Sequence, residues 1–143
     1  MGKSETIPKI MKKHHNQLEG ILNRFIKSQN EYEVFPNMFN KFKWELEKHF
    51  FLEEKAVFIY LYSDDKESND MRLKLREEHN LILKQLEKIE SDLIEKKDLN
   101  FSVFKDLLRT HRAFEDEIFY PKLEKELDES KKQQIIDRIS NPI

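Results

Sequence analysis

The sequence predicts an all-α protein, an up-and-down antiparallel four-helix bundle in which one helix pair repeats the other. Three observations predict this fold. The 143 residues include two glycines and four prolines, too few for a sheet protein with many tight turns. Apolar residues recur at steps of three and four along four long segments, which is the period of a helix with one buried face. The pattern of the first two segments returns in the last two.

The first two helices are predicted over residues 7–28 and 37–62. Pro8 lies in the first turn of the first helix, where a missing N–H costs little, and Pro36 precedes the second helix. The first buried stripe is expected to contain Ile7, Met11, Leu18, Leu22 and Phe25. The second is expected to contain Phe39, Phe42, Leu46, Ala56 and Tyr60.

The other two helices are predicted over residues 69–95 and 101–127, after a polar break, SDDKESND, at 63–70. The third stripe is expected to contain Met71, Leu75, Ile82, Leu86, Ile89 and Leu93. The fourth is expected to contain Phe101, Phe104, Leu108 and Ile118. Short links between long helices favour antiparallel neighbours. We therefore expect one domain over 1–143, with its core at about 7–127.

The tail, 128–143, is expected to add one more short helical piece through Ile135, Ile136 and Ile139. Several aromatic residues of the second and fourth helices are expected to form packing layers of the bundle. They are Trp44, Phe50, Phe51, Phe58, Phe114 and Tyr120.

Polar residues interrupt each buried stripe, and they are all histidine or glutamate. They are His15, His49, Glu53, His79, His111 and Glu115. One core histidine alone is usually just hydrogen-bonded, and one His-x-x-x-Glu alone is usually a surface pair. Four of the chain's five histidines on buried stripes, together with two glutamates, instead predict a metal site. The fifth, His14, is one step off the stripe, so we expect it to be exposed or at the rim.

The six residues also obey the internal repeat. A shift of 62 residues (111 − 49) superposes the two His-x-x-x-Glu segments, and a shift of 64 residues (79 − 15) superposes the two lone histidines. Residues four apart lie one above the other on one helix face, so each histidine and its glutamate can point inward together. Each helix pair therefore contributes one lone histidine and one His-x-x-x-Glu.

The chemistry of this set indicates two metal ions. Two buried carboxylates without partners would repel each other and lose their hydration, whereas two bridged divalent ions remove both costs. The six residues provide two histidines for each ion and two glutamates that both ions share. This set of protein ligands leaves room for an outside ligand. Imidazole and carboxylate suit iron, zinc or manganese. We expect two iron ions, with zinc or manganese as the alternative. Asp116 is an alternative to Glu115 if the fourth helix is slightly rotated.

Composition excludes several other classes. The formal net charge of −2 provides no basic excess for nucleic acid, and the absence of cysteine excludes disulfides and thiolate ligands. No apolar run approaches the roughly 20 residues of a membrane span. The start, MGKSETIPKI, lacks the apolar core of a signal peptide. We expect a cytoplasmic protein without nucleic-acid or membrane partners.

Four stretches carry a resemblance to a known family: KKHHNQLEGIL, LEKHFFLEEKAVF, LREEHNLILKQL and LLRTHRAFEDEIFYPKL. They resemble the hemerythrin-like family, the HHE cation-binding domain, over roughly 7 to 125. The resemblance implies a non-haem di-iron centre bridged by the two glutamates. It assigns iron ligation to His15, His49, Glu53, His79, His111 and Glu115.

The chain departs from the oxygen-carrying members that it resembles. Those have a fifth histidine four residues from the third-helix histidine, but Leu75 and Leu83 stand four either side of His79 here. They also have an aspartate five after the fourth-helix histidine, where this chain has Asp116. The set of four histidines and two glutamates is closer to bacterial proteins that repair iron–sulfur centres. The small cysteine-bearing domain of those proteins has no counterpart here.

The sequence supports three hypotheses for function. The first is a di-iron protein that binds or reacts with O₂ or NO, for sensing, storage or protection against oxidative or nitrosative stress. The second is a di-iron enzyme that handles peroxide or NO or repairs iron centres. Ferritin-like oxidases use more carboxylates and a Glu-x-x-His spacing, which argues mildly against that subclass. The third is a metal-responsive regulatory or interaction module, and a protein partner is left open.

Overall fold

The computed structural model describes residues 6–29, 34–58 and 66–140, and every regular element in these ranges is helical. The elements are α1 (Ile7–Lys27), α2 (Val34–Leu52), η1 (Glu53–Val57), α3 (Lys66–Ile94), α4 (Ser102–Phe114), η3 (Glu115–Phe119), α5 (Tyr120–Glu126) and α6 (Glu129–Ser140). Two of them, η1 and η3, are π-helical. The predicted all-α class is confirmed.

The chain forms two compact units. The first unit contains residues up to Tyr60 together with those from Tyr120 onward, and the second contains Leu61–Phe119. None of the described helices is both long and apolar enough to span a membrane.

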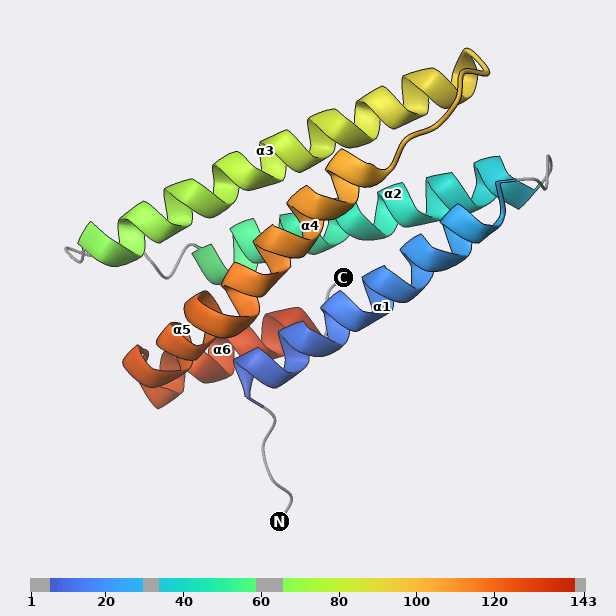
Figure 1. Cartoon of the computed structure of the whole chain (residues 1–143). Helices are drawn as coiled ribbons and strands as arrows, with labels where there is room; N and C mark the ends of the chain where they lie inside the picture. Colours follow the sequence, from blue (N-terminus) through green and yellow to red (C-terminus); the bar gives the residue numbers. More distant parts are fainter. Residues whose placement is uncertain (1–5, 30–33, 59–65, 141–143) are drawn as a thin grey trace. The chain divides into compact units, whose positions relative to one another are not determined.

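In the first unit, α1 and α2 pack against each other as an antiparallel pair (Figure 1). Thr6 caps α1, because its hydroxyl accepts a hydrogen bond from the Lys9 N–H at 3.3 Å. The five residues predicted for the stripe of this helix are all buried. In α2 the helix starts at Val34, earlier than predicted. Pro36 is its third residue, where no intrahelical N–H bond is needed.

An aromatic cluster joins α1 to the start of α2. Phe25 is fully buried and stacks on Phe35 with ring centroids 4.8 Å apart. Phe39 meets Phe25 edge to face at 5.3 Å, and the ring of Phe42 lies 6.3 Å from that of Phe25. Such pairs contribute about 0.5–1.5 kcal/mol each beyond the burial of their area. This cluster fixes the register of α1 and α2, the helices that carry His15 and His49.

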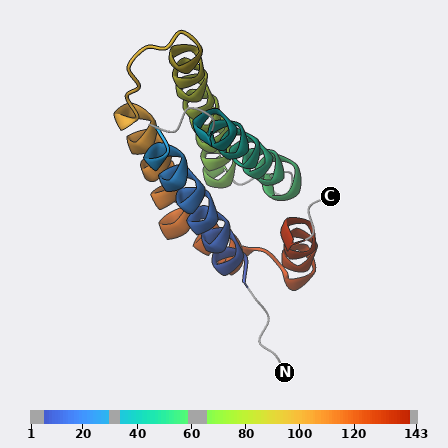
Figure 2. The ribbon, with the colours of Figure 1, turned by 90° about the vertical axis from the view of Figure 1, so that its right-hand side faces the viewer.

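The rest of the first unit packs around α1. Helices α5 and α6 both contact α1, and α6 also contacts η1. The Ile7 N–H at the start of α1 donates to Glu124 of α5 at 3.1 Å. Figure 2 shows α6 (dark red) as a separate short helix that comes after α5. Ile135 and Ile139 are its buried residues, so the predicted helical piece in the tail is confirmed.

In the second unit, α3 and α4 form another antiparallel pair (Figure 1). Helix α3 begins at Lys66, three residues earlier than predicted, so the predicted polar break is wrong for residues 66–68, and residues 63–65 lie outside the described ranges. Charged residues four apart support a helix, and Lys66 Nζ lies 3.2 Å from Asp70 Oδ2. Four predicted stripe residues of α3 are buried, namely Leu75, Ile82, Leu86 and Ile89, and Met71 and Leu93 are half-buried.

Three residues that were predicted to pack in the interior are exposed. Ile118 is 47% exposed, whereas its neighbours Phe119 and Tyr120 are buried. The cause is η3, since hydrogen bonds from residue i to i+5 fit one more residue into the turn and rotate the residues after it. Trp44 and Phe51 are 60% and 61% exposed and form no packing layer. Tyr60, also predicted to be buried, lies outside the described residues.

Candidate metal centre

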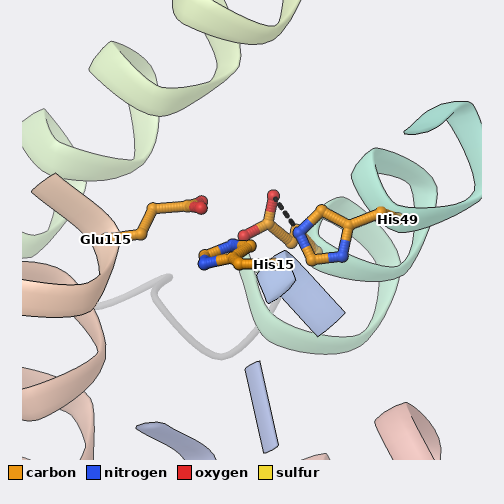
Figure 3. Close-up of side chains that lie close together, drawn as sticks. His15, His49 and Glu115 are labelled. Carbon is orange, nitrogen blue, oxygen red and sulfur yellow. Dashed lines mark ion pairs between the residues drawn. The ribbon is translucent and has the colours of Figure 1, made fainter. Parts of the chain in front are cut away.

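Three side chains of the first unit meet in a buried group. His15 comes from α1, His49 from α2 and Glu53 from the first position of η1. Each offers one ligand atom, and these atoms lie within 4.8 Å of one another. The two imidazoles meet edge to face with ring centroids 5.0 Å apart, and a dashed line in Figure 3 marks the His49–Glu53 ion pair. We call these residues the first-unit group.

Three side chains of the second unit meet in the same way. His79 comes from α3, His111 from α4 and Glu115 from the first position of η3, and their ligand atoms also lie within 4.8 Å of one another. The ring centroids of the two histidines are 4.9 Å apart. The side chain of Glu115 extends away from its helix (Figure 3) and is fully buried. We call these residues the second-unit group.

The two groups have matching internal geometry. The histidine rings are inclined by 67° in the first-unit group and by 64° in the second-unit group. In both, Nε2 of the helix histidine faces the glutamate four residues later, at 3.6 Å from Glu53 and 3.2 Å from Glu115. Both glutamates begin a π-helix, a feature that often marks functional sites. The repeat seen in the sequence therefore extends to side-chain and backbone conformation.

The donors in each group fit a divalent ion. With metal–ligand bonds of about 2.0–2.2 Å, two ligands of one ion lie no more than about 4.4 Å apart. The spacing of at most 4.8 Å within each group is close to that limit. Glu53 and Glu115 have no exposed surface, and a buried carboxylate is costly unless a cation or hydrogen bonds compensate it. Two imidazoles and one carboxylate are ligands that iron, zinc and manganese accept.

Glu78 contacts the second-unit group from outside and was not predicted. Its Oε1 lies 2.7 Å from Nδ1 of His111, and its other oxygen accepts a hydrogen bond from Lys74. Burial alone would raise the pKa of Glu78, but the hydrogen bonds from His111 and Lys74 outweigh it and lower that pKa. Its carboxylate therefore holds the proton of His111 on Nδ1 and leaves the Nε2 lone pair facing Glu115.

Tyr120 contacts the first-unit group. Its hydroxyl donates a hydrogen bond to Oε2 of Glu53, and its ring lies 6.2 Å from that of His15. The side chain has no exposed surface. Tyr120 was predicted only as a packing residue. Its hydroxyl could have indicated the contact, because a buried tyrosine usually forms a hydrogen bond with a nearby polar group.

The two remaining candidates lie outside the groups. Asp116 belongs to neither group, and its carboxylate accepts a hydrogen bond from Arg112 Nε at 3.4 Å. Glu115 is the carboxylate of the second-unit group. His14 is half-buried, as expected for a rim residue, with its ring 5.8 Å from that of His49. Burial, followed by the neighbouring His15, lowers the pKa of His14.

A half-open cavity of about 550 Å³ reaches the first-unit group beside His14 and His49. Residues of α1, α2 and the end of α6 line it, among them Lys48 and Ile139. His49 is the one member of the first-unit group that lines it.

Comparisons with known proteins identify the family. The sequence model of the hemerythrin HHE cation binding domain matches residues 6–138. No curated protein and no solved structure matches the chain. The family match covers nearly the whole chain and includes both groups of histidine and glutamate. The chain belongs to the hemerythrin HHE cation-binding domain family.

Proposed function

We propose that this protein holds two iron ions and uses them to bind or react with O₂ or NO, in sensing, storage or stress protection. The proposed ligands are His15, His49, Glu53, His79, His111 and Glu115, with the two glutamates bridging. The proposal includes an up-and-down four-helix bundle made of the α1–α2 and α3–α4 pairs. Family membership supports cation binding, and the internal repeat of the sequence supports a paired site.

One observation carries the proposal: each unit has a buried group of two imidazoles and one carboxylate with matching geometry. With both glutamates bridging, each ion has four protein ligands, two imidazoles and two carboxylates, and an octahedral ion keeps further coordination positions for an outside molecule. When bound, two iron ions would supply those positions and the redox chemistry that O₂ and NO require. The protein's own contribution is to hold His49 and His111 with Nε2 facing the glutamates and to exclude water around the carboxylates.

The first experiment measures metal content. Protein purified without oxygen and without added metal should contain two iron ions per chain. Glu115→Ala should reduce that number, whereas Glu117→Ala, an exposed neighbour in the same π-helix, should not. Zinc in place of iron would overturn the iron assignment, and equal metal content in the two variants would overturn the ligand assignment.

The second experiment tests the ligand. Reduced, iron-loaded protein is titrated optically with O₂ and, separately, with NO, and the proposal predicts a saturable spectral change with at least one gas. No change with either gas would contradict it. Steady turnover of peroxide or NO, lost in Glu53→Ala, would instead favour the enzyme hypothesis.

A further inference from the structure

We propose that the two metal-binding groups are unequal and that the second-unit group takes up the first ion. This inference rests on the proposed function, since it concerns the same two groups. It is based on residues that contact the proposed ligands. These residues differ between the two halves of the chain, whereas the proposed ligands are the same in both halves.

The first difference is at the helix histidines. Glu78 lies 2.7 Å from Nδ1 of His111, so the carboxylate fixes the ring orientation and makes the Nε2 lone pair a stronger donor. The shift that superposes the lone histidines places His14 at the position of Glu78 (78 − 64 = 14). His14 accordingly lies beside His49, the counterpart of His111, with ring centroids 5.8 Å apart. An imidazole carries no negative charge, so His14 cannot act on His49 as the Glu78 carboxylate acts on His111.

The second difference is at the glutamates. Tyr120 donates a hydrogen bond to Glu53, which draws electron density from that carboxylate and makes it a weaker metal donor. The shift that superposes the His-x-x-x-Glu segments places Phe58 at the position of Tyr120 (120 − 62 = 58). Phe58 is buried like Tyr120 but carries no hydroxyl.

Both differences act in the same direction. The second-unit group gains an oriented, more basic imidazole, and the first-unit group has a carboxylate whose donor strength is reduced. Outer partners of this kind typically change metal affinity by about 10–100-fold. We therefore expect stepwise loading, with the first ion bound at least about tenfold more tightly than the second.

Titration of the metal-free protein with Co²⁺ tests the order of loading. Co²⁺ reports its own coordination in the visible spectrum and involves no gas or turnover. The wild type should bind two ions in two resolved steps. His79→Ala should remove the tight step, and His15→Ala should remove the weak one. Two steps of equal affinity, or the opposite assignment, would overturn the inference.

Variants of the outer residues test the cause. Glu78→Gln should weaken the tight step by about 10–100-fold, whereas Glu77→Gln, an exposed neighbour, should leave both steps unchanged. His14→Glu supplies a carboxylate at the equivalent position and should tighten the weak step. Tyr120→Phe should also tighten that step. Circular dichroism and thermal melts of the metal-free variants separate these effects from loss of folding.

The outcomes distinguish this inference from the proposed function. Two ions bound with wild-type affinities in both Glu78→Gln and His14→Glu would overturn the cause assigned to the inequality and leave the paired site intact. No Co²⁺ bound at the concentrations used would overturn both. A gain of metal affinity in His14→Glu would support the inference, because damage to the fold would lower the affinity and not raise it.

Discussion

Glu53 and Glu115, which are 62 residues apart in the sequence (115 − 53), each occupy the first position of a π-helix. The π-helices span five residues each, Glu53–Val57 and Glu115–Phe119, so the same shift superposes them completely. A π-turn is less favourable than the α-helix that it interrupts, and its presence at both glutamates links the irregular backbone to the candidate metal site. The two halves of the chain thus share a π-helix at the same position as well as a residue pattern.

Metal binding should stabilise the fold. An ion present at 100 times its dissociation constant contributes about 2.7 kcal/mol, which corresponds to a rise in melting temperature of roughly 5–10 °C for a domain of this size. Differential scanning calorimetry of metal-free and loaded protein measures this shift, and a chelator should reverse it. His111→Ala should show a much smaller shift. A melting temperature that is independent of metal would contradict the ligand assignment.

Glu53→Gln should change stability and metal binding in opposite directions. The carboxylate has no exposed surface, so in metal-free protein its charge opposes folding, whereas an amide keeps an oxygen acceptor for the Tyr120 hydroxyl. We expect the metal-free variant to be more stable by roughly 1 kcal/mol or more in urea unfolding, and to bind metal poorly. A less stable metal-free variant would show that the hydrogen bonds of Glu53 already compensate its burial.

The docking of α6 should depend on Ile135. This side chain is fully buried, and Ile135→Ala should reduce the free energy of unfolding by roughly 2–4 kcal/mol. Ile136→Ala, at a half-buried position one residue later, is the matched control and should cost much less. Urea denaturation of both variants gives the comparison. Equal losses would show that α6 contributes through its helix propensity and not through its buried face.

Lys132 should make the contact between α5 and α6 sensitive to alkaline pH. Its amino group lies 2.8 Å from Glu129 and 3.2 Å from Glu124, and hydrogen bonds to these two carboxylates raise the pKa of the lysine above 10.5. A raised pKa means that the stabilisation is fully present below pH 10.5 and disappears as the pH rises through the folded-state pKa.

Lys132→Met removes this ion pair at every pH. The difference in unfolding free energy between wild type and variant should therefore shrink as the pH rises from about 9 to about 12. Urea unfolding at several pH values measures it. A difference that stays constant over this range would assign the contribution of Lys132 to the packing of its methylene groups.

The helices and the inward positions of the histidines and glutamates were predictable because both depend on the same period. Apolar residues at steps of three and four define one face, and His15, His79 and the two His-x-x-x-Glu segments lie on that face. The exposure of Trp44 and Phe51 was not predicted, because large apolar side chains are not required to be buried. Their positions on α2 fall outside the stripe, and the period was a better guide than the residue type.

The contacts just outside the two groups of histidine and glutamate were harder to predict. Glu78 stands next to His79 in the sequence but contacts His111, 33 residues away. Tyr120 contacts Glu53, 67 residues away. Such pairs depend on how the helices pack, which a periodic pattern does not specify. Ile118 was misplaced for a related reason, since no residue type in this stretch signals that the helix will widen at Glu115.

Helix α6 touches both α1 and η1, the segments that carry His15 and Glu53. We therefore expect order in α6 and occupancy of the first-unit group by a metal ion to be linked equilibria. By reciprocity, a change that loosens α6 would weaken metal binding there by the same factor by which loss of the metal would loosen α6. Helix α6 would then report on the outside of the protein whether that group holds an ion.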